Sequence, residues 1–330
     1  MIEARAYARV GLLGNPSDGY FGKTIAFVFQ NFRARVLLRP SSRIEIRPSK
    51  EDSPVWDSLD EMRCVTRWRG YYGGIRIIQA LVIRFTDYCL EKGITLADHN
   101  FTIEYESNIP QRLGLGGSSA IITATLRVLM KHFEIDIPLP MQANLVLETE
   151  TEELGVTAGL QDRVAQAYEG LVFMDFDKKR MESDGYGRYE KLDPGLLPNV
   201  YVAYRSSMSE GTEVFHNNIR ARYQSGETVV VEAMQAWAEM AEQGRKALVD
   251  GDMERLTCLI NANFDLRSRI YRISPGNEEM IRVARQAGAT AKFAGSGGAI
   301  VGTYNDDNHL QALTAELAEI GVVVIKPVVR

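Results

Sequence analysis

The stretch Gly114–Ser119, which reads GLGGSS, constrains the fold more than any other part of the sequence. Residues 101–107 before it alternate apolar and polar side chains as a strand does, and residues 118–133 after it carry apolar side chains at helical spacing. The first turn of a helix has free N–H groups and a partial positive charge, and glycines let an anion approach that backbone. The segment therefore predicts either a phosphate-binding loop or a plain turn between a strand and a helix.

The two serines of this stretch also allow two interpretations. Ser118 and Ser119 are able to cap the helix, or to offer a hydroxyl to Mg²⁺ that is held by phosphate. The fingerprint of nicotinamide cofactors, G-x-G-x-x-G, is excluded because its third glycine would fall at Ser119. No acidic residue ends a strand about 20 residues later either, as that fingerprint requires.

A second glycine-rich segment lies near the N-terminus. Gly22-Lys23-Thr24 matches the end of the Walker A pattern, but the first glycine of that pattern would fall at Ser17. Residues 25–29 are typical of a strand rather than of the helix that follows a Walker loop. We therefore expect a strand over 9–13, a polar turn and a second strand. Such a turn presents Asp18 and Lys23 to a pocket, or it is an ordinary hairpin connection with solvated charges.

Composition restricts the class of protein. At 330 residues the chain is long enough for two domains, and its net charge of −5 argues against a general nucleic-acid binder. No apolar run approaches the roughly 20 residues that span a membrane, and the N-terminal residues lack the pattern of a secretory signal. Three cysteines and four histidines are scattered without metal-ligand spacing. We expect a cytoplasmic enzyme with reduced thiols. The net charge does not exclude an anionic substrate, because a few local cations are enough to bind one.

The pattern of apolar residues divides the chain near residue 198. Residues 1–198 mix strands and helices, with helical spacing over 75–89 and 141–153. Charged and glycine-rich residues precede the division, and Pro194 and Pro198 interrupt the pattern there. Residues 199–330 alternate strands with long helical stretches, which favours an antiparallel sheet covered by helices. We predict an α+β protein with domains 1–198 and 199–330.

Three motifs, taken in order, resemble those of the GHMP kinase superfamily. The first runs from Arg9 to Asp18, the second from Pro110 to Ala120, and the third from Lys292 to Ala299. Together they span nearly the whole chain, so the match is more specific than one glycine-rich loop. Two further stretches, Gly70–Arg76 (GYYGGIR) and Ala158–Phe176 (AGLQDRVAQAYEGLVFMDF), resemble the glucuronokinases within that superfamily.

The resemblance implies a fold and an activity. The fold would be an N-terminal α/β domain with a left-handed β-α-β unit and a C-terminal ferredoxin-like domain. The activity would be ATP-dependent phosphorylation of D-glucuronate at its anomeric hydroxyl, with Mg²⁺, giving the 1-phosphate and ADP. Two alternatives stay open: a kinase for another substrate such as galactose, a heptose or mevalonate, and a non-catalytic protein that binds sugar and nucleotide. A nicotinamide-dependent oxidoreductase is weakened by the failed fingerprint.

The resemblance also implies the catalytic and nucleotide-binding residues. Asp162 lies where the superfamily has the aspartate that accepts the proton of the attacking hydroxyl or orients that hydroxyl, and Arg9 matches the basic residue paired with it. The magnesium ligands would be Ser118 and Glu150. The third motif would close over the active site. The residues that would hold the nucleotide come from the second and third motifs: Pro110, Gly114, Leu115, Gly116, Gly117, Ser118, Ser119, Ala120, Gly295 and Gly297.

The sugar would be bound by residues of the first motif and by a cation. Asp18 would bind sugar hydroxyls. Tyr20 would stack on the sugar or hydrogen-bond to it, or else pack in the core. A uronate carboxylate demands a cation, preferably an arginine. The candidate cations are Lys23, Arg76, Arg112 and Arg267. Two positions depart from the superfamily: Asn15-Pro16 replaces Glu-His, and Gly117 replaces the first of two paired serines. Arg163, next to Asp162, is interpreted as a surface neighbour.

Overall fold

The computed structural model describes residues 1–49, 52, 73–97, 99–205 and 219–329. Within the stretch Gly70–Arg76, residues 70–72 lie outside the described residues. The chain divides into two compact units that are each built from separate segments of sequence. The first comprises Met1–Ala8, Phe32–Arg112 and Gly116–Ala167, and the second comprises Arg9–Asn31, Leu113–Leu115 and Tyr168–Arg330. The domain boundary near residue 198 stays a prediction.

Two long strands, β1 (Ile2–Leu13) and β2 (Lys23–Pro40), contribute to both units. In the first unit, the end of β2 pairs antiparallel with β4 (Phe101–Ser107), and β3 (Glu45–Ile46) pairs parallel with β4. In the second unit, the start of β2 pairs antiparallel with β5 (Leu171–Asp175), which pairs antiparallel with β6 (Arg188–Leu192). The strand order is β3-β4-β2-β5-β6, with β1 beside β2. The strands predicted at 9–13 and 101–107 are confirmed.

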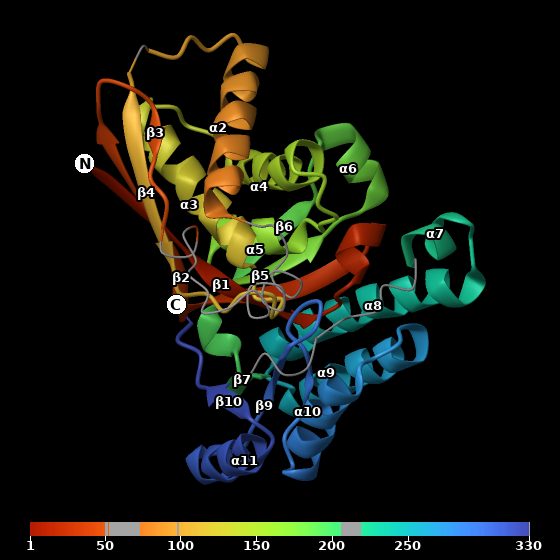
Figure 1. The fold of residues 1–330 in the computed structure, drawn as a ribbon. Coiled ribbons are helices and arrows are strands. Elements are labelled where there is room, and N and C mark those ends of the chain that lie inside the picture. The colour runs from red at the N-terminus through yellow and green to blue at the C-terminus, as the bar shows by residue number, and fades with distance from the viewer. Residues whose placement is uncertain (50–51, 53–72, 98, 206–218, 330) are drawn as a thin grey trace, which may run out of the picture. The chain divides into compact units, whose positions relative to one another are not determined.

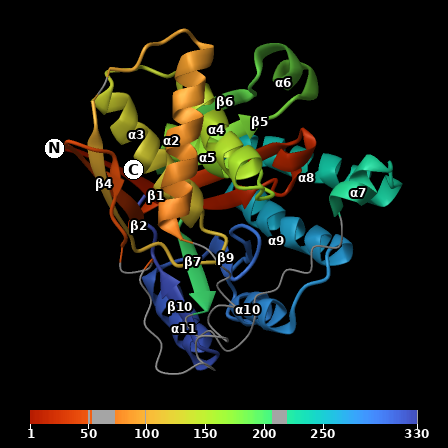
Figure 2. The same cartoon turned by 45° about the horizontal axis from the view of Figure 1, so that its top comes forward.

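Three helices of the first unit pack against one another: α2 (Gly74–Glu91), α3 (Gly117–His132) and α4 (Leu139–Glu148). They lie side by side in Figure 1, and Figure 2 shows the same arrangement from a second direction. The predicted helices over 75–89 and 118–133 are confirmed as α2 and α3. The helix predicted over 141–153 differs, because α4 ends at Glu148 and a π-helical turn, Thr149–Glu153, follows before α5 (Gln161–Tyr168).

The second unit contains a second sheet and most of the remaining helices. After a 3-10 turn at Ser17–Tyr20 and the strands already given, its elements are α6 (Lys178–Asp184), a 3-10 turn at Pro194–Leu196, β7 (Val200–Arg205), α7 (Ile219–Gln224), α8 (Thr228–Asp250), α9 (Met253–Ile270), α10 (Pro275–Gln286), β8 (Lys292–Phe293), β9 (Ala299–Thr303), α11 (Asp307–Glu319) and β10 (Val322–Ile325). Polar side chains begin three of these α-helices. Asp177 accepts from the Arg180 N–H before α6, Asp252 accepts from the Arg255 N–H before α9, and Asp306 accepts from the His309 N–H before α11.

The second sheet confirms the predicted ferredoxin-like domain. Its strands are all antiparallel and lie in the order β10-β7-β9-β8. Helices connect β7 to β8 and β9 to β10, so the chain follows the β-α-β-β-α-β sequence of that fold. Tyr201 and Ile300 from the sheet share a buried core with Ala284 of α10 and Leu313 of α11. Figure 1 shows α11 beside β10 and α8 beside α9.

Candidate active site

The glycine-rich segment of the second motif is a left-handed turn that leads into α3. Gly114 has a φ of 63° and Gly116 has a φ of 74°, which are conformations that favour glycine. A Cβ atom on Gly114 would lie 2.8 Å from the backbone nitrogen of Ser296, so backbone meets backbone too closely for a side chain. Free N–H groups at the start of α3 would fit the oxygens of a phosphate chain. The glycines of the turn and the helix start that follows them are therefore of the kind that the implied ATP requires.

Ser118 and Ser119 differ in the contacts of their side chains. Ser119 is 1% exposed, and its hydroxyl donates a hydrogen bond to the Gly116 carbonyl at 3.1 Å. Ser118 is half-buried. Because the Ser119 proton is used inside the turn, Ser118 is the better candidate for a magnesium ligand. At Gly117 an added Cβ would make ordinary contact with Ile109 at 3.5 Å, so the loss of the superfamily's serine there has no steric cause.

The remaining nucleotide-binding candidates of this motif could contact a nucleotide only through their backbone where their side chains are buried. Leu115 is 1% exposed and Ala120 is 0% exposed, so their side chains belong to the core. Pro110 is half-buried. The assignment of these residues to the nucleotide stays a prediction.

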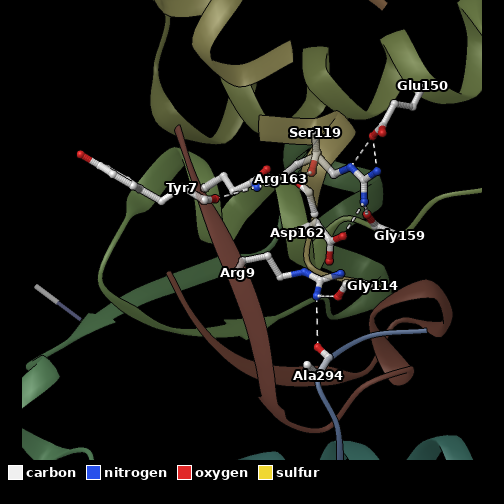
Figure 3. Close-up of polar contacts among 11 residues, drawn as sticks. Tyr7, Arg9, Gly114, Ser119, Glu150, Gly159, Asp162, Arg163 and Ala294 are labelled. Carbon is white, nitrogen blue, oxygen red and sulfur yellow. Dashed lines mark hydrogen bonds and ion pairs between the residues drawn. The ribbon is translucent and has the colours of Figure 1, made fainter. Parts of the chain in front are cut away.

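Arg163 corrects the interpretation of that residue as a surface neighbour. Its side chain is 8% exposed and forms an ion pair with Glu150, whose side chain is 4% exposed. The Nε atom donates to Glu150 Oε2 at 2.6 Å, and Nη1 donates to the Gly159 carbonyl at 2.8 Å. Nη1 also lies 3.4 Å from Asp162 Oδ2. Figure 3 shows the guanidinium of Arg163 between the two carboxylates, an arrangement that no local pattern of sequence predicts.

This pair bears on the predicted magnesium ligand. The Glu150 carboxylate is buried and its charge is balanced by Arg163, in the π-helical turn that follows α4. Serine hydroxyls and carboxylates supply the oxygen ligands that Mg²⁺ prefers, so the residue types fit the metal. Among the described residues, no group of three or more His, Cys, Asp or Glu side chains is arranged to hold a metal ion. A magnesium ion at Ser118 and Glu150 would thus need phosphate oxygens as further ligands. This site stays a prediction.

Arg9 connects two glycine-rich segments of the second unit. It lies in β1 and is 5% exposed. Its Nη1 atom donates to the Gly114 carbonyl at 2.6 Å and to the Ala294 carbonyl at 3.1 Å, as Figure 3 shows. Gly295 has no room for a side chain, because a Cβ atom there would collide with the Gly114 carbonyl. Gly297 has a φ of 144°, a conformation that favours glycine.

The predicted sugar-binding residues have different surroundings. Asp18 and Tyr20 lie in the 3-10 turn of the second unit, and the Tyr20 ring packs on Tyr223 with centroids 4.7 Å apart. Lys23, in the same unit, has two acidic partners: Glu242 at 2.6 Å and Asp175 at 3.6 Å. The Lys23 charge is therefore already balanced. Arg76 lies exposed in the first turn of α2, in the first unit.

Asn15, at one of the departures from the superfamily, is buried and hydrogen-bonded. It is 4% exposed, and its Oδ1 atom accepts a hydrogen bond from Lys292 Nζ at 2.7 Å. Its backbone carbonyl accepts from the Asn263 side chain at 3.2 Å. A neutral amide here serves as the acceptor for a buried lysine 277 residues away, which no local pattern of sequence indicates.

The similarity to known proteins agrees with the glycine-rich loops of the second and third motifs and with the ferredoxin-like sheet. A model of the GHMP kinases N terminal domain matches residues 79–170, and a model of the GHMP kinases C terminal domain matches residues 245–323. The chain belongs to the GHMP kinase family. None of the helices in the described ranges is long and apolar enough to cross a membrane.

Within this family the chain is similar to plant glucuronokinases. Probable glucuronokinase 2 of Arabidopsis thaliana is 44% identical over 308 residues, which cover 91% of this chain and 84% of that protein. Glucuronokinase 1 of the same organism is 43% identical over 306 residues, with the same coverage of both chains. Among solved structures, the galactokinase of Lactococcus lactis complexed with galactose has a TM-score of 0.77 at 16% identity, over 99% of this chain and 93% of that one. This last likeness shows the fold alone.

Proposed function

We propose that this chain is a glucuronokinase, which transfers the γ-phosphoryl group of ATP to the anomeric hydroxyl of D-glucuronate. The observation that carries the proposal is the identity of 44% to a glucuronokinase relative over 91% of the chain. The left-handed turn at Gly114 and the N-terminus of α3 support the nucleotide part of it. A cytoplasmic location and the lack of a nucleic-acid partner remain predictions from composition.

Asp162 is the residue that we assign to the attacking hydroxyl. Its side chain is 16% exposed in the first turn of α5, so the carboxylate retains access to a reactant. The anomeric oxygen forms a bond to the γ-phosphorus, the bond from that phosphorus to the bridging oxygen breaks, and ADP leaves. The proton of the hydroxyl passes to the Asp162 carboxylate, or is held by it in a hydrogen bond until transfer is complete.

The phosphate chain would be held by backbone and by charge. The N–H groups that begin α3 would bind phosphate oxygens, with Ser118 and Glu150 as the metal ligands of this chain. Mg²⁺, when bound, supplies neutralisation of the phosphate charge. Arg9 would stabilise the charge that develops on the transferred group. Its buried guanidinium is already oriented by two backbone carbonyls, so little reorganisation is needed during the reaction.

A panel of acceptors tests the proposal directly. The purified protein is given Mg·ATP with D-glucuronate, D-galacturonate, D-galactose, a heptose or mevalonate, and ADP release is followed together with detection of the sugar 1-phosphate. We expect turnover with D-glucuronate to exceed turnover with the other acceptors. Turnover with galactose and none with glucuronate would reject the substrate and leave the kinase. ATP binding without turnover on any acceptor would favour the non-catalytic alternative.

A further inference from the structure

Four consecutive backbone carbonyl groups of the third motif accept hydrogen bonds from buried cationic side chains. All three donor residues belong to the second unit, as do the acceptors. The pairs are Lys292 Nζ with the Phe293 carbonyl (2.7 Å), Arg9 Nη1 with that of Ala294 (3.1 Å), and Arg267 Nη1 and Nη2 with those of Gly295 (3.0 Å) and Ser296 (3.1 Å). The cations thus lie on the carbonyl side of the loop.

Lys292 carries its charge without an acidic partner in the described part of the chain. It is 1% exposed, and Nζ donates to the Gly11 carbonyl at 2.6 Å, to Asn15 Oδ1 at 2.7 Å and to the Phe293 carbonyl. Burial, followed by the charges of Arg267 and Arg9, lowers the pKa of Lys292 well below that of a free lysine. Three oxygen acceptors nevertheless require three N–H donors, and only the ammonium form has three.

Arg267 is a second buried cation of this kind. It is 5% exposed, and besides the two loop carbonyls its guanidinium contacts the faces of Tyr271 and Phe293, with centroid distances of 4.9 Å and 5.1 Å. Its Nε atom is buried and has no hydrogen-bond partner among the residues that the structure describes. No carboxylate in the described ranges pairs with Arg267. A buried cation without a counter-charge is costly, so a ligand that supplies negative charge is expected nearby.

The geometry of the peptide group shows where such a ligand would lie. In a trans peptide the N–H group points away from the carbonyl of the same peptide, and the one cis bond in the described chain is Asn15–Pro16. Because the carbonyls of residues 294–296 face the cations, the N–H groups of Gly295, Ser296 and Gly297 face the opposite side. Within the described chain these three N–H groups have no acceptor. Successive N–H groups of this kind form a concave site for an anion.

We propose that Lys292 and Arg267 support an oxyanion site at the N–H groups of Gly295, Ser296 and Gly297, which binds an anionic group of a reactant. The two cations are positioning residues, because they act on the anion through the peptide dipoles of the loop. The ligand chemistry is a phosphate or a carboxylate oxygen. The proposed function supplies both sources, namely the phosphate chain of ATP and the carboxylate of the uronate. Arg267, a candidate cation from the sequence, then serves the anion without touching it.

Two substitutions at Arg267 separate charge from structure. Arg267→Lys and Arg267→Gln both keep an N–H donor for the loop carbonyls, but only lysine keeps the charge. Lys292→Met removes the second charge at similar side-chain length. The matched control is Arg245→Met, which removes an arginine of the same unit that is paired with Glu190 at 2.9 Å. All variants are first compared by thermal unfolding.

Binding is measured by calorimetry at constant ionic strength with two probes, sodium tripolyphosphate and sodium D-glucuronate, each alone. We expect Arg267→Gln and Lys292→Met to weaken the binding of one probe by about tenfold or more, because a buried charge is lost. Arg267→Lys and Arg245→Met should stay near the wild-type affinity. The probe whose affinity falls in these variants identifies the source of the anion. The inference would be overturned if Arg267→Gln bound both probes as tightly as Arg267→Lys does. It would also be overturned if the wild-type protein bound neither probe.

These measurements are independent of turnover. A protein that phosphorylates no uronate, yet loses tripolyphosphate binding in Arg267→Gln, would reject the proposed substrate and retain the oxyanion site. A protein with glucuronokinase activity and equal probe affinities in all variants would retain the function and reject the site.

Discussion

A single side chain, Arg163, holds two carboxylates of the first unit in a fixed relation. It pairs with the buried Glu150 and lies 3.4 Å from Asp162. An acidic side chain that is 4% exposed requires such a partner, because an isolated buried charge is strongly disfavoured. Arg163 therefore fixes the carboxylate that is a candidate metal ligand relative to the carboxylate that is the candidate base.

Arg163→Met should lower the free energy of unfolding by about 3–5 kcal/mol, because it breaks the buried ion pair with Glu150 by removing one of its two charges. Urea unfolding of the two proteins measures this difference. The double variant Glu150→Gln/Arg163→Met removes the buried negative charge as well and should recover part of the loss. Equal stability of the single and the double variant would contradict the role of this ion pair.

Asp162→Asn should reduce turnover by roughly 10²–10⁴-fold, because an amide cannot accept the proton of the attacking hydroxyl. ATP affinity should change little, since Asp162 is assigned to the sugar and not to the nucleotide. Single-turnover kinetics and nucleotide titration check the two expectations separately. The control is Asp177→Asn, which makes the same chemical change at the cap of α6. Turnover retained in Asp162→Asn would remove that residue from its assigned role.

At the scale of elements, the turn between β4 and α3 depends on glycine for two separate reasons. Gly114 has a positive φ, and a side chain there would also meet the Ser296 nitrogen at 2.8 Å. Gly251, which ends α8, shares only the first property: its φ is 73° and nothing lies near its missing Cβ. The two positions therefore form a matched pair.

Both Gly114→Ala and Gly251→Ala should lose about 1–2 kcal/mol of stability through the left-handed backbone. Only Gly114→Ala should also lose kinase activity, because the added methyl group displaces the third motif from the second. Thermal unfolding and initial rates on the two variants measure this. Full activity in Gly114→Ala would show that the close approach of the two backbones is dispensable.

The helices show what the periodicity of apolar residues predicts and what it does not predict. The helices over 75–89 and 118–133 follow from regular apolar spacing, and α2 and α3 bury apolar side chains along their length. The helix predicted over 141–153 instead passes into a π-helical turn at Thr149. That turn carries Glu150, whose partner Arg163 comes from α5. A contact between two elements is not encoded in the spacing within one of them.

At the scale of the whole molecule, the three sequence motifs were sufficient to predict the family and the ferredoxin-like order of the second sheet. The motifs did not predict which groups accept hydrogen bonds from Lys292, because Gly11 and Asn15 lie far from it in sequence. They also did not indicate the two compact units, each assembled from three separate segments. Long strands such as β1 and β2 contribute to both units, and sequence order cannot reveal that division.

The stability of the whole chain should depend on pH through Lys292. Burial, followed by the charges of Arg267 and Arg9, lowers the folded pKa of Lys292 well below the unfolded value of 10.5. Between those two values the unfolded chain binds more protons than the folded chain, so the free energy of unfolding contributed by Lys292 rises with pH. Urea unfolding, followed as the pH is raised above the folded pKa toward 10.5, should show a steeper rise in wild type than in Lys292→Met. Parallel curves would contradict a lowered pKa.

The three cations behind the third motif have a practical consequence for handling the enzyme. Sulfate and inorganic phosphate share the oxygen chemistry of the proposed ligands, whereas chloride lacks it. A preparation stored in phosphate buffer would melt at a higher temperature than one in a chloride buffer of equal ionic strength, and it would show a higher apparent KM for the reactant that occupies the oxyanion site. With such a site, kinetic constants for this kinase would be comparable only between assays that use the same buffer anion.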